Sequence, residues 1–496
     1  MAELSIPPLL AHRPEAVPAL RGRTLLLPLL LAIVGIMIAQ AAAIAGQQER
    51  RANDQTSLVN ARLFWQNSLA QATLHDDPPA KIADLRDKLA AAQNARLAGY
   101  DAPGRHFTNW DGYRYEEIVR GGYVYDLPSD TPAMRNDSRI QRPGWPEPRT
   151  KNVVWYPLYP ILGWLVMHAL GISANAALTL IAELCAAGAA VIVFLYARRH
   201  YYNRMPLLVV SGDEALTQRH PSRRWELSPE DSGALWAVAA LMFGPCAVFL
   251  YANYTESLFM LLLGLFLYCL QGRRWWWAAI VAGIAAASRS QGVLFGPVLA
   301  LTYLARSDVR QPLLRLGIAV LLGIISATGI LAFMAYLGVT FHDPLAFVHC
   351  ERFWNVGVNT ATLREALNPI NALTDVLRHA FFTTPVDWPR LWEALCLIWP
   401  PVMLLILGGR FLSFELELVG WLLWGLPYVS NSLAGYPAEA SKWMSMGRFM
   451  EVMLPAQIIL GALIMRFRWA GVPLLALSSA AFAIFAYKFG AGQWVG

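Results

Sequence analysis

The chain has 496 residues, of which 56% are hydrophobic and 15% are charged, and its mean hydropathy is +0.39. This balance excludes an ordinary soluble protein, and repeated apolar runs of about 20 residues predict an all-α bundle of membrane-spanning helices in a lipid bilayer. The net charge is +6, but the basic residues gather at the ends of apolar runs, as the positive-inside bias requires, so no nucleic-acid partner is expected. The five cysteines show no CxxC spacing, which argues against a zinc site or a disulfide framework.

The N-terminal segment, residues 1–23, carries Arg13, Arg21 and Arg23 shortly before the first apolar run. These arginines predict a cytoplasmic N-terminus. The run itself, residues 24–46, is too long for a cleavable signal peptide and lacks a clear cleavage site, so it is predicted to be a retained first span. Residues 47–152 then form a long first loop on the outer side of the membrane.

This first outer loop divides into two parts. Residues 55–74 have helical spacing, the pattern breaks at residues 75–79, and a second helix is predicted from there to Gly99. That helical hairpin is interpreted as a lid or spacer. The second part contains Asn109-Trp110-Asp111-Gly112-Tyr113, a stretch rich in aromatic and acidic residues between two apolar regions.

Residues 153–173 pose the main question of topology. Pro157 and Pro160 interrupt the start of this apolar segment, and the remainder is short for ~30 Å of hydrocarbon. If the segment does not cross the membrane, every short basic cluster further along the chain lies in the cytoplasm. If it does cross, all of these clusters lie on the outer side, against the positive-inside bias. The segment is therefore predicted to be a helix on the outer surface.

The remaining chain is predicted to contain a membrane module at residues 174–337, a second long outer loop at 338–390 and C-terminal spans at 391–496, giving about eleven spans in all. Residues 275–305 are too few for two full crossings, so two short half-spans are expected to meet near Ser288–Gly292. Arg289 lies at that turn. Because an arginine in hydrocarbon costs ~2.5–3.5 kcal/mol, Arg289 is expected to face a polar cavity or an anionic partner.

With this topology, several polar stretches collect on the outer face. Asp111 is the candidate general base, because a carboxylate can accept the proton of an attacking hydroxyl. Arg289 and Arg448 are candidates for binding a phosphate, and Glu256 for orienting these groups. The other candidate substrate-binding residues are Trp110, Tyr113, Tyr156, Tyr254, His342 and Asp343. Two or three acids and two arginines beside a membrane suit group transfer from a lipid phosphate by a single in-line displacement.

Each of these residues also has a simpler structural interpretation. Glu256 could complement a helix N-terminus, worth ~0.3–1 kcal/mol. His342 and Asp343 could cap a turn before Pro344, and Arg448 could be an interfacial anchor. Asn253-Tyr254-Thr255 matches a glycosylation sequon, but a site against the membrane is a poor acceptor. The convergence of the candidates on one face favours the functional interpretation.

The order of several short motifs resembles one family. These motifs are Trp110-Asp111, Gly121-Gly122-Tyr123, Tyr156-Pro157-Leu158-Tyr159-Pro160, Tyr254-Thr255-Glu256-Ser257-Leu258-Phe259, Ala287-Ser288-Arg289-Ser290-Gln291-Gly292 and His342-Asp343-Pro344-Leu345-Ala346-Phe347, with Gly447-Arg448-Phe449 as a weaker later match. They occur in the order seen in PIG-V-type mannosyltransferases, which belong to the GT-C glycosyltransferases. The match covers roughly residues 106–350.

The resemblance implies a GT-C-type helical bundle that transfers mannose from a polyprenyl-phosphate carrier to a glycolipid, glycan or protein acceptor on the outer or luminal face. It also implies that Asp111 is the catalytic acidic residue of the first loop and that Glu256 lies near it. The chain departs from the family in residues 47–105, an insertion before Trp110-Asp111, and in Ser290-Gln291 in place of the usual Ser-Asn. The Ala-, Arg- and Leu-rich composition favours a bacterial inner membrane, with a periplasmic site, over the endoplasmic reticulum.

Metal dependence is left open by the sequence. Asp111 and Glu256, with Asp343, are the candidate ligands for Mg²⁺ or Mn²⁺, provided that they converge. Two other functions are also compatible with the sequence. A multi-span transporter or lipid flippase would use the 275–305 hairpin as a broken helix at its binding site. A non-catalytic partner subunit would have no activity as a purified single chain.

Overall fold

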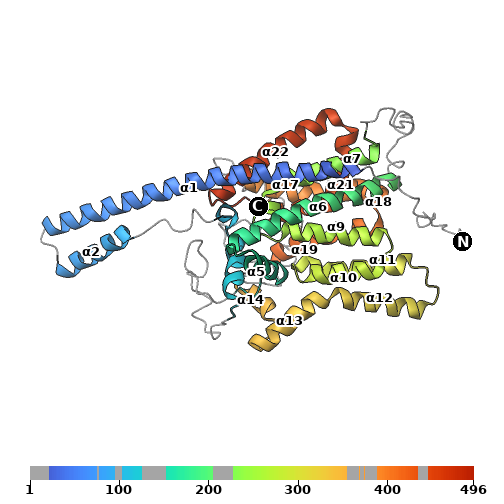
Figure 1. Ribbon diagram of the computed structural model, residues 1–496, viewed down its shortest axis with the longest axis horizontal. Coiled ribbons are helices and arrows are strands. Elements are labelled where there is room, and N and C mark those ends of the chain that lie inside the picture. Colours follow the sequence, from blue (N-terminus) through green and yellow to red (C-terminus); the bar gives the residue numbers. More distant parts are fainter. Residues whose placement is uncertain are drawn as a thin grey trace.

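The computed structural model describes residues 22–74, 78–94, 103–125, 152–204, 227–354, 368, 374, 388–433 and 445–495. This part of the chain is built from helices and contains no β-strand (Figure 1). Most of the predicted cytoplasmic N-terminus, the tail of the first outer loop and most of the second outer loop lie outside the described residues.

The first predicted span and the first half of the predicted hairpin form one continuous helix, α1 (Leu26–Leu74), which follows a short 3-10 turn, η1 (Gly22–Leu25). Its 49 residues correspond to about 74 Å, so α1 projects well beyond the helical bundle (Figure 1). Helix α2 (Pro79–Asn94) folds back against this projection. The helix is uninterrupted because residues 47–74 contain neither proline nor glycine.

The segment predicted to lie on the outer surface forms a short helix, α5 (Leu158–Leu170). Pro160 is in its first turn, where a missing N–H removes no helical hydrogen bond. Its 13 residues span about 20 Å, too little to cross ~30 Å of hydrocarbon. The helix contacts α3 (Asp111–Gly121) and α6 (Ala174–Arg204), and it leaves Ile161, Trp164 and Leu165 exposed. A helix of this length with one exposed apolar face suits the predicted surface position.

The two short helices expected at 275–305 are present as α10 (Trp275–Ala286) and α11 (Phe295–Arg306). A turn containing Arg289 and a 3-10 helix, η6 (Ser290–Leu294), connect them where the sequence places the break. Gly292 permits this turn, since an added Cβ would lie 2.0 Å from the carbonyl oxygen of Ala285. Each helix has 12 residues, about 18 Å, and reaches only part of the way across a bilayer.

Three apolar segments that hydropathy alone would assign to single helices are interrupted. The first breaks at Gly244-Pro245, between α7 (Pro229–Met242) and α8 (Val248–Tyr251), because Pro245 has no N–H for the helix. Another forms α20 (Met446–Glu451) and α21 (Leu454–Arg466), with Pro455 in the first turn of the second helix. The third bends by 50° between α12 (Pro312–Ser326) and α13 (Thr328–Phe341).

The other helices complete the bundle. They are η2 (Arg105–Phe107), α9 (Glu256–Gln271), α14 (Ala346–Trp354), α17 (Trp388–Met403) with a π-helical turn at Leu404–Gly408, α18 (Gly409–Phe411), α19 (Phe414–Leu433) and α22 (Arg468–Gly490). Within the described residues, three helices are long and apolar enough to span a membrane, located in α1, α6 and α22, and the bent α12–α13 pair would add a fourth. The predicted membrane helices are thus present, but the count of about eleven spans is not confirmed.

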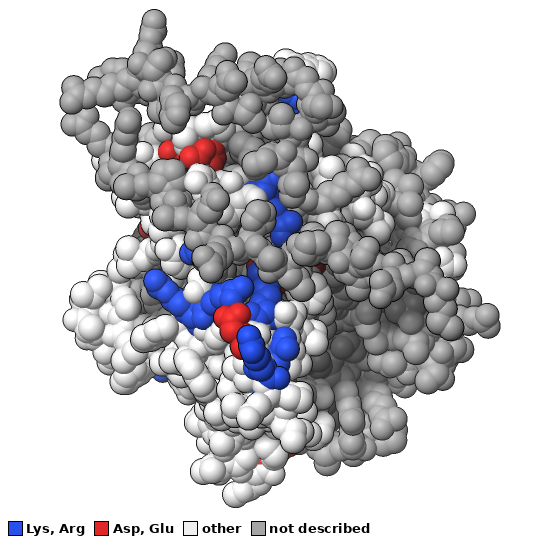
Figure 2. All heavy atoms as spheres, turned by 90° about the vertical axis from the view of Figure 1, so that its right-hand side faces the viewer, with Lys and Arg blue, Asp and Glu red and all other residues white. Residues whose placement is uncertain are grey.

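One end of the bundle carries a basic surface. Helix α9 begins at Glu256 and ends at Gln271, about 24 Å away, where Arg273 pairs with Asp308 at 3.1 Å. Helix α11 likewise ends at Arg306, far from the turn that carries Arg289. Figure 2 shows lysine and arginine side chains gathered over this end, with a few acidic residues among them. The described part of the fold therefore places the candidate site and this basic surface at opposite ends.

Candidate active site

Four charged side chains from separate segments of the sequence form one continuous series of ion pairs. Nη1 of Arg448 lies 2.6 Å from Oδ2 of Asp111 and donates a hydrogen bond to it. Nε of Arg448 lies 3.1 Å from Oε1 of Glu256, and Nη1 of Arg289 lies 3.1 Å from the same oxygen. The order is therefore Asp111–Arg448–Glu256–Arg289, and the structure brings together the four residues to which the sequence analysis gave a chemical role.

Burial is uneven along these four residues, which we call the ion network. The Glu256 side chain is 1% exposed, those of Arg289 and Arg448 are 10% and 11% exposed, and that of Asp111 is 33% exposed. Asp111 is thus the member most accessible to a substrate from solvent. The formal charges of the four groups cancel, as expected when ionised groups are held out of water.

Hydrogen bonding in the ion network is incomplete. Nε of Arg448 and Nη1 of Arg289 are close enough to Glu256 for ion pairs but lack hydrogen-bond geometry toward any described group. Oε2 of Glu256 also has no hydrogen-bond partner. An unsatisfied buried donor costs about 1–3 kcal/mol, more when charged, so the two arginine N–H groups favour a bound species that supplies acceptors, whereas Oε2 of Glu256 lacks a donor.

Aromatic rings enclose both guanidinium groups. Phe449 lies between them, with its ring centroid 5.1 Å from Cζ of Arg448 and 5.4 Å from Cζ of Arg289. Tyr254 and Phe259 provide further faces, at 5.3 Å from Arg448 and 5.4 Å from Arg289. Such cation–π contacts stabilise a positive charge while keeping water away from it.

Asp111 is held at the start of α3 by a strained and well-anchored segment. Trp110, just before the helix, has φ 46° and ψ −111°, outside the usual regions for a residue with a side chain. Its ring packs edge-on against Phe489 and Trp494, with centroids 5.3 and 5.0 Å apart. Asn109 is fixed by a hydrogen bond from its Nδ2 to the carbonyl oxygen of Phe489 at 2.8 Å and by one from the Tyr254 hydroxyl to its own carbonyl at 3.0 Å. Local strain maintained by tertiary contacts is typical of functional positions.

A buried polar cluster anchors the backbone behind Asp111. Asn253 is 0% exposed and donates to Thr108 Oγ1 at 2.6 Å, while Thr179 donates to its Oδ1 at 2.7 Å. Thr108 in turn donates to Oδ1 of Asn175 at 3.1 Å. Asn253 is therefore a structural residue at the end of the bundle that carries Asp111, and its sequon is inaccessible for glycosylation.

The turn and helix ends that carry the arginines depend on close backbone approaches. Gly447 precedes Arg448, and an added Cβ there would lie 2.8 Å from Sγ of Cys246 and 2.9 Å from the ring of Trp392. The Arg289 turn is fixed from the other side, because the amide of Leu158 donates to the carbonyl of Ala287 at 2.9 Å. The start of α5 therefore positions the segment from which Arg289 extends.

The structure adds site residues that sequence reasoning did not single out. Tyr115 is one helical turn after Asp111, and burial raises the pKa of its hydroxyl, with the charges of Asp111 and Glu256 adding to the effect. It remains a neutral hydrogen-bonding group at physiological pH. Phe489 and Trp494 come from the C-terminal end, where no pattern in the sequence indicated contact with Trp110.

The remaining candidates lie in two places. Tyr113 is on α3, and Cζ of Arg105 lies 4.6 Å from the centroid of the Tyr113 ring. The Tyr113 hydroxyl donates a hydrogen bond to Oδ1 of Asn109 at 3.4 Å. Tyr156 packs in a second cluster of aromatic residues from α13 and α14. His342 ends α13 in a left-handed conformation, with φ 58°. Asp343 accepts a hydrogen bond from the amide of Leu345 at 3.0 Å, which fits the turn-capping interpretation.

The three candidate metal ligands are not brought together. Asp343 is bonded to Tyr125 and His349, whereas Asp111 and Glu256 are each paired with Arg448. Within the described residues, no group of three or more His, Cys, Asp or Glu side chains could hold a metal ion. The residues present therefore do not fit a Mg²⁺ or Mn²⁺ site, and no step is assigned to a metal.

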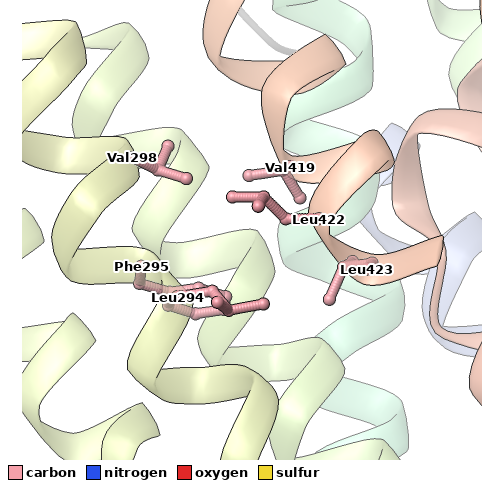
Figure 3. A pocket seen from close by; sticks show the side chains of 6 residues that line it. All are labelled: Leu294, Phe295, Val298, Val419, Leu422 and Leu423. Atoms are coloured by element: carbon pink, nitrogen blue, oxygen red, sulfur yellow. The ribbon is translucent and has the colours of Figure 1, made fainter. Parts of the chain in front are cut away.

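A narrow apolar gap lies between η6 and α11 on one side and α19 on the other (Figure 3). It is too small to hold a water molecule, so the side chains on its two sides are closely packed. Its lining is entirely aliphatic or aromatic and consists of Leu294, Phe295, Val298, Val419, Leu422 and Leu423. Leu294 follows Arg289 by five residues of 3-10 geometry, a rise of about 10 Å.

Comparison with known proteins gives few matches. No protein-family model matches the chain, and neither does any curated protein. Two solved structures of an oligosaccharyltransferase from Archaeoglobus fulgidus are similar. The one in complex with Zn and sulfate has 13% identity and a TM-score of 0.36, covering 79% of this chain and 49% of that one. The one tethered to an acceptor peptide with an NVT sequon has 12% identity and a TM-score of 0.33, covering 80% and 52%. The chain thus spans about half the length of these structures, and a likeness at this level assigns it neither a family nor an activity.

Proposed function

We propose that this chain is a membrane glycosyltransferase of GT-C type that transfers a sugar, with mannose the first candidate, from a polyprenyl-phosphate carrier to a hydroxyl of a glycolipid, glycan or protein. The observation that carries the proposal is the ion network, in which an accessible carboxylate stands next to two enclosed arginines. Asp111 is the general base, Arg289 and Arg448 bind the donor phosphate, and Glu256 holds the two guanidinium groups in place.

The reaction is a single displacement at the anomeric carbon. The acceptor oxygen forms a bond to that carbon while the bond from the carbon to the phosphate oxygen breaks. The acceptor proton passes to Asp111, and the bonding electron pair leaves with the polyprenyl phosphate. One such displacement inverts the configuration at the anomeric carbon.

The charge balance of the ion network matches this reaction. The donor is a phosphodiester with one negative charge, and the departing polyprenyl phosphate gains a second. Protonation of Asp111 changes the network from neutral to a charge of +1 and releases Arg448 from its closest partner. The guanidinium is then free to bind the developing phosphate charge, which is the kind of preorganised electrostatic stabilisation that lowers a barrier.

The donor class is tested with membranes that contain the chain and with matched membranes that lack it, each given radiolabelled polyprenyl-phosphate-mannose. We expect label to enter a new product only where the chain is present. Polyprenyl-phosphate-glucose and polyprenyl-phosphate-arabinose, assayed in parallel, identify a different donor sugar. Absence of transfer from all three, with folded protein present, contradicts the proposal.

A transporter or lipid flippase is the second candidate, and the interrupted helices favour it. Transporter sites are formed by discontinuous helices, and the breaks at the Arg289 turn and between α20 and α21 both adjoin the ion network. Flux of labelled polyprenyl-phosphate-mannose across proteoliposomes without formation of product would support this function and exclude transfer.

A further inference from the structure

A second polar cluster lies outside the ion network, where the end of α3 meets α13 and α14. Oδ2 of Asp343 accepts a hydrogen bond from the Tyr125 hydroxyl at 2.6 Å and lies 2.7 Å from Nδ1 of His349. Because a carboxylate only accepts, Nδ1 of His349 carries the proton in this contact. The tautomer is thereby fixed, and in the neutral ring Nε2 presents a lone pair as an acceptor.

This arrangement leaves one ligand-binding atom available. The His349 side chain is 38% exposed, and Nε2 has no protein partner within the described part of the chain. Burial by itself would raise the pKa of Asp343, but hydrogen bonds from Tyr125, His349 and the Leu345 amide hold it below its usual range. Asp343 therefore stays ionised and keeps the imidazole oriented at physiological pH.

Tyr125 belongs to a cluster of aromatic rings. Tyr125 packs edge-on against Phe341 with centroids 5.7 Å apart, and Tyr156 contacts Phe333 and Phe347 at 6.0 Å each. Flat amphipathic rings with a few placed polar groups are the usual lining of a small-molecule site. Sugars combine apolar C–H faces with hydroxyls, so both halves of this lining have a counterpart on a sugar ring.

The aromatic cluster is continuous with the ion network. Ala286 belongs to it and stands three residues before Arg289. Tyr123 also packs against this cluster, and its hydroxyl donates to the carbonyl of Trp155 at 2.7 Å. The cluster therefore adjoins the chain segments that carry the ion network.

We propose that the cluster formed by Tyr125, Asp343 and His349, with the rings of Tyr156 and Phe347, binds a sugar residue of the acceptor. Nε2 of His349 accepts a hydrogen bond from a sugar hydroxyl, and the rings pack against the apolar face. This inference rests on the proposed function and narrows the acceptor to a carbohydrate or a glycosylated lipid. His349 is a positioning residue and does not act on the reacting atoms.

Binding is tested first, without any donor. Saturation-transfer NMR on the purified full chain uses the methyl α-glycosides of mannose, glucose and galactose as probes. We expect at least one probe to bind, with its affinity reduced about fivefold in His349→Ala, the effect of losing one hydrogen bond. His349→Gln, which retains an acceptor, recovers part of the affinity. Tyr336→Phe removes a hydroxyl at the edge of the same cluster and serves as the matched control.

Kinetics then separate this inference from the proposed function. With polyprenyl-phosphate-mannose as donor and the octyl glycoside of the bound sugar as acceptor, His349→Ala should raise the acceptor KM about fivefold and leave the donor KM and the slow donor hydrolysis unchanged. Binding at His349 without any donor consumption by the wild type would overturn the transferase and leave a sugar-binding site. Failure of all three glycosides to bind, or equal binding by folded His349→Ala, overturns the inference.

Discussion

Glu256→Gln is expected to destabilise the chain and to abolish transfer, because Glu256 is the only ion-pair partner that Arg289 has within the described residues. The carboxylate is 1% exposed and lies 3.1 Å from nitrogens of both arginines. Removing one partner of a buried pair costs about 3–5 kcal/mol. Glutamine keeps the size and one acceptor oxygen, so the lower end, about 3 kcal/mol, is expected. In a chain of 496 residues that corresponds to a melting temperature lower by about 3 °C.

The measurement is thermal unfolding of the purified protein, followed by the monomer fraction that survives heating, alongside the transfer assay. Glu415→Gln is the matched control, since Glu415 is a 2% exposed carboxylate paired with Arg306 at the opposite end of the bundle. It should also lower the melting temperature, but leave transfer intact. Glu256→Gln combined with Arg289→Met restores a neutral network and should recover stability without activity. A Glu256→Gln variant with wild-type stability, or a double variant less stable than the single one, would refute the reasoning.

Three further outcomes are expected. Gly292→Ala should prevent formation of the Arg289 turn, because the added Cβ would lie 2.0 Å from a backbone oxygen. Gly317→Ala should be neutral, because an added Cβ there has no neighbour within 4 Å. The yield of folded protein compares the two variants. Leu422→Trp should lower the melting temperature, because the apolar gap beside Leu422 is too small for a larger ring and overpacking costs about 1–3 kcal/mol. Wild-type thermal unfolding of this variant would contradict close packing between α11 and α19. Burial lowers the pKa of His106 to about 4, so the unfolded state binds the extra proton and stability should fall as the pH drops from about 6.5 to 4. His106→Gln should reduce that dependence, as unfolding at several pH values would show.

The sequence predicted the features that depend on local pattern. Composition indicated the membrane helices, the proline positions indicated the short α5, and the length of residues 275–305 indicated two half-spans with Arg289 between them. The convergence of Asp111, Glu256, Arg289 and Arg448 followed from placing loops on one face by their charges. Arg448 is 337 residues from Asp111, and only topology could relate the two.

What the sequence did not predict depends on tertiary contacts. The breaks at Gly244-Pro245 and after Glu451 lie within apolar runs, where hydropathy alone does not distinguish one helix from two. Tyr156 and Asp343 were grouped with Asp111 because all three fall in outer segments, but Asp343 is bonded to His349 and Tyr125 in a cluster of its own. An outer segment specifies a face of the protein, and only packing decides which side chains on that face meet.

The central claim is that Asp111 takes the acceptor proton. The most direct test is the rate of transfer by Asp111→Asn, which keeps the side-chain shape and an acceptor for Arg448. The control is Asp308→Asn, because the Asp308 side chain is 91% exposed and lies at the opposite end of the bundle. We expect Asp111→Asn to fold and to be slower by a factor of about 10²–10⁴, with donor binding retained and Asp308→Asn unaffected. A folded Asp111→Asn protein that transfers sugar within a few-fold of the wild-type rate would contradict the account.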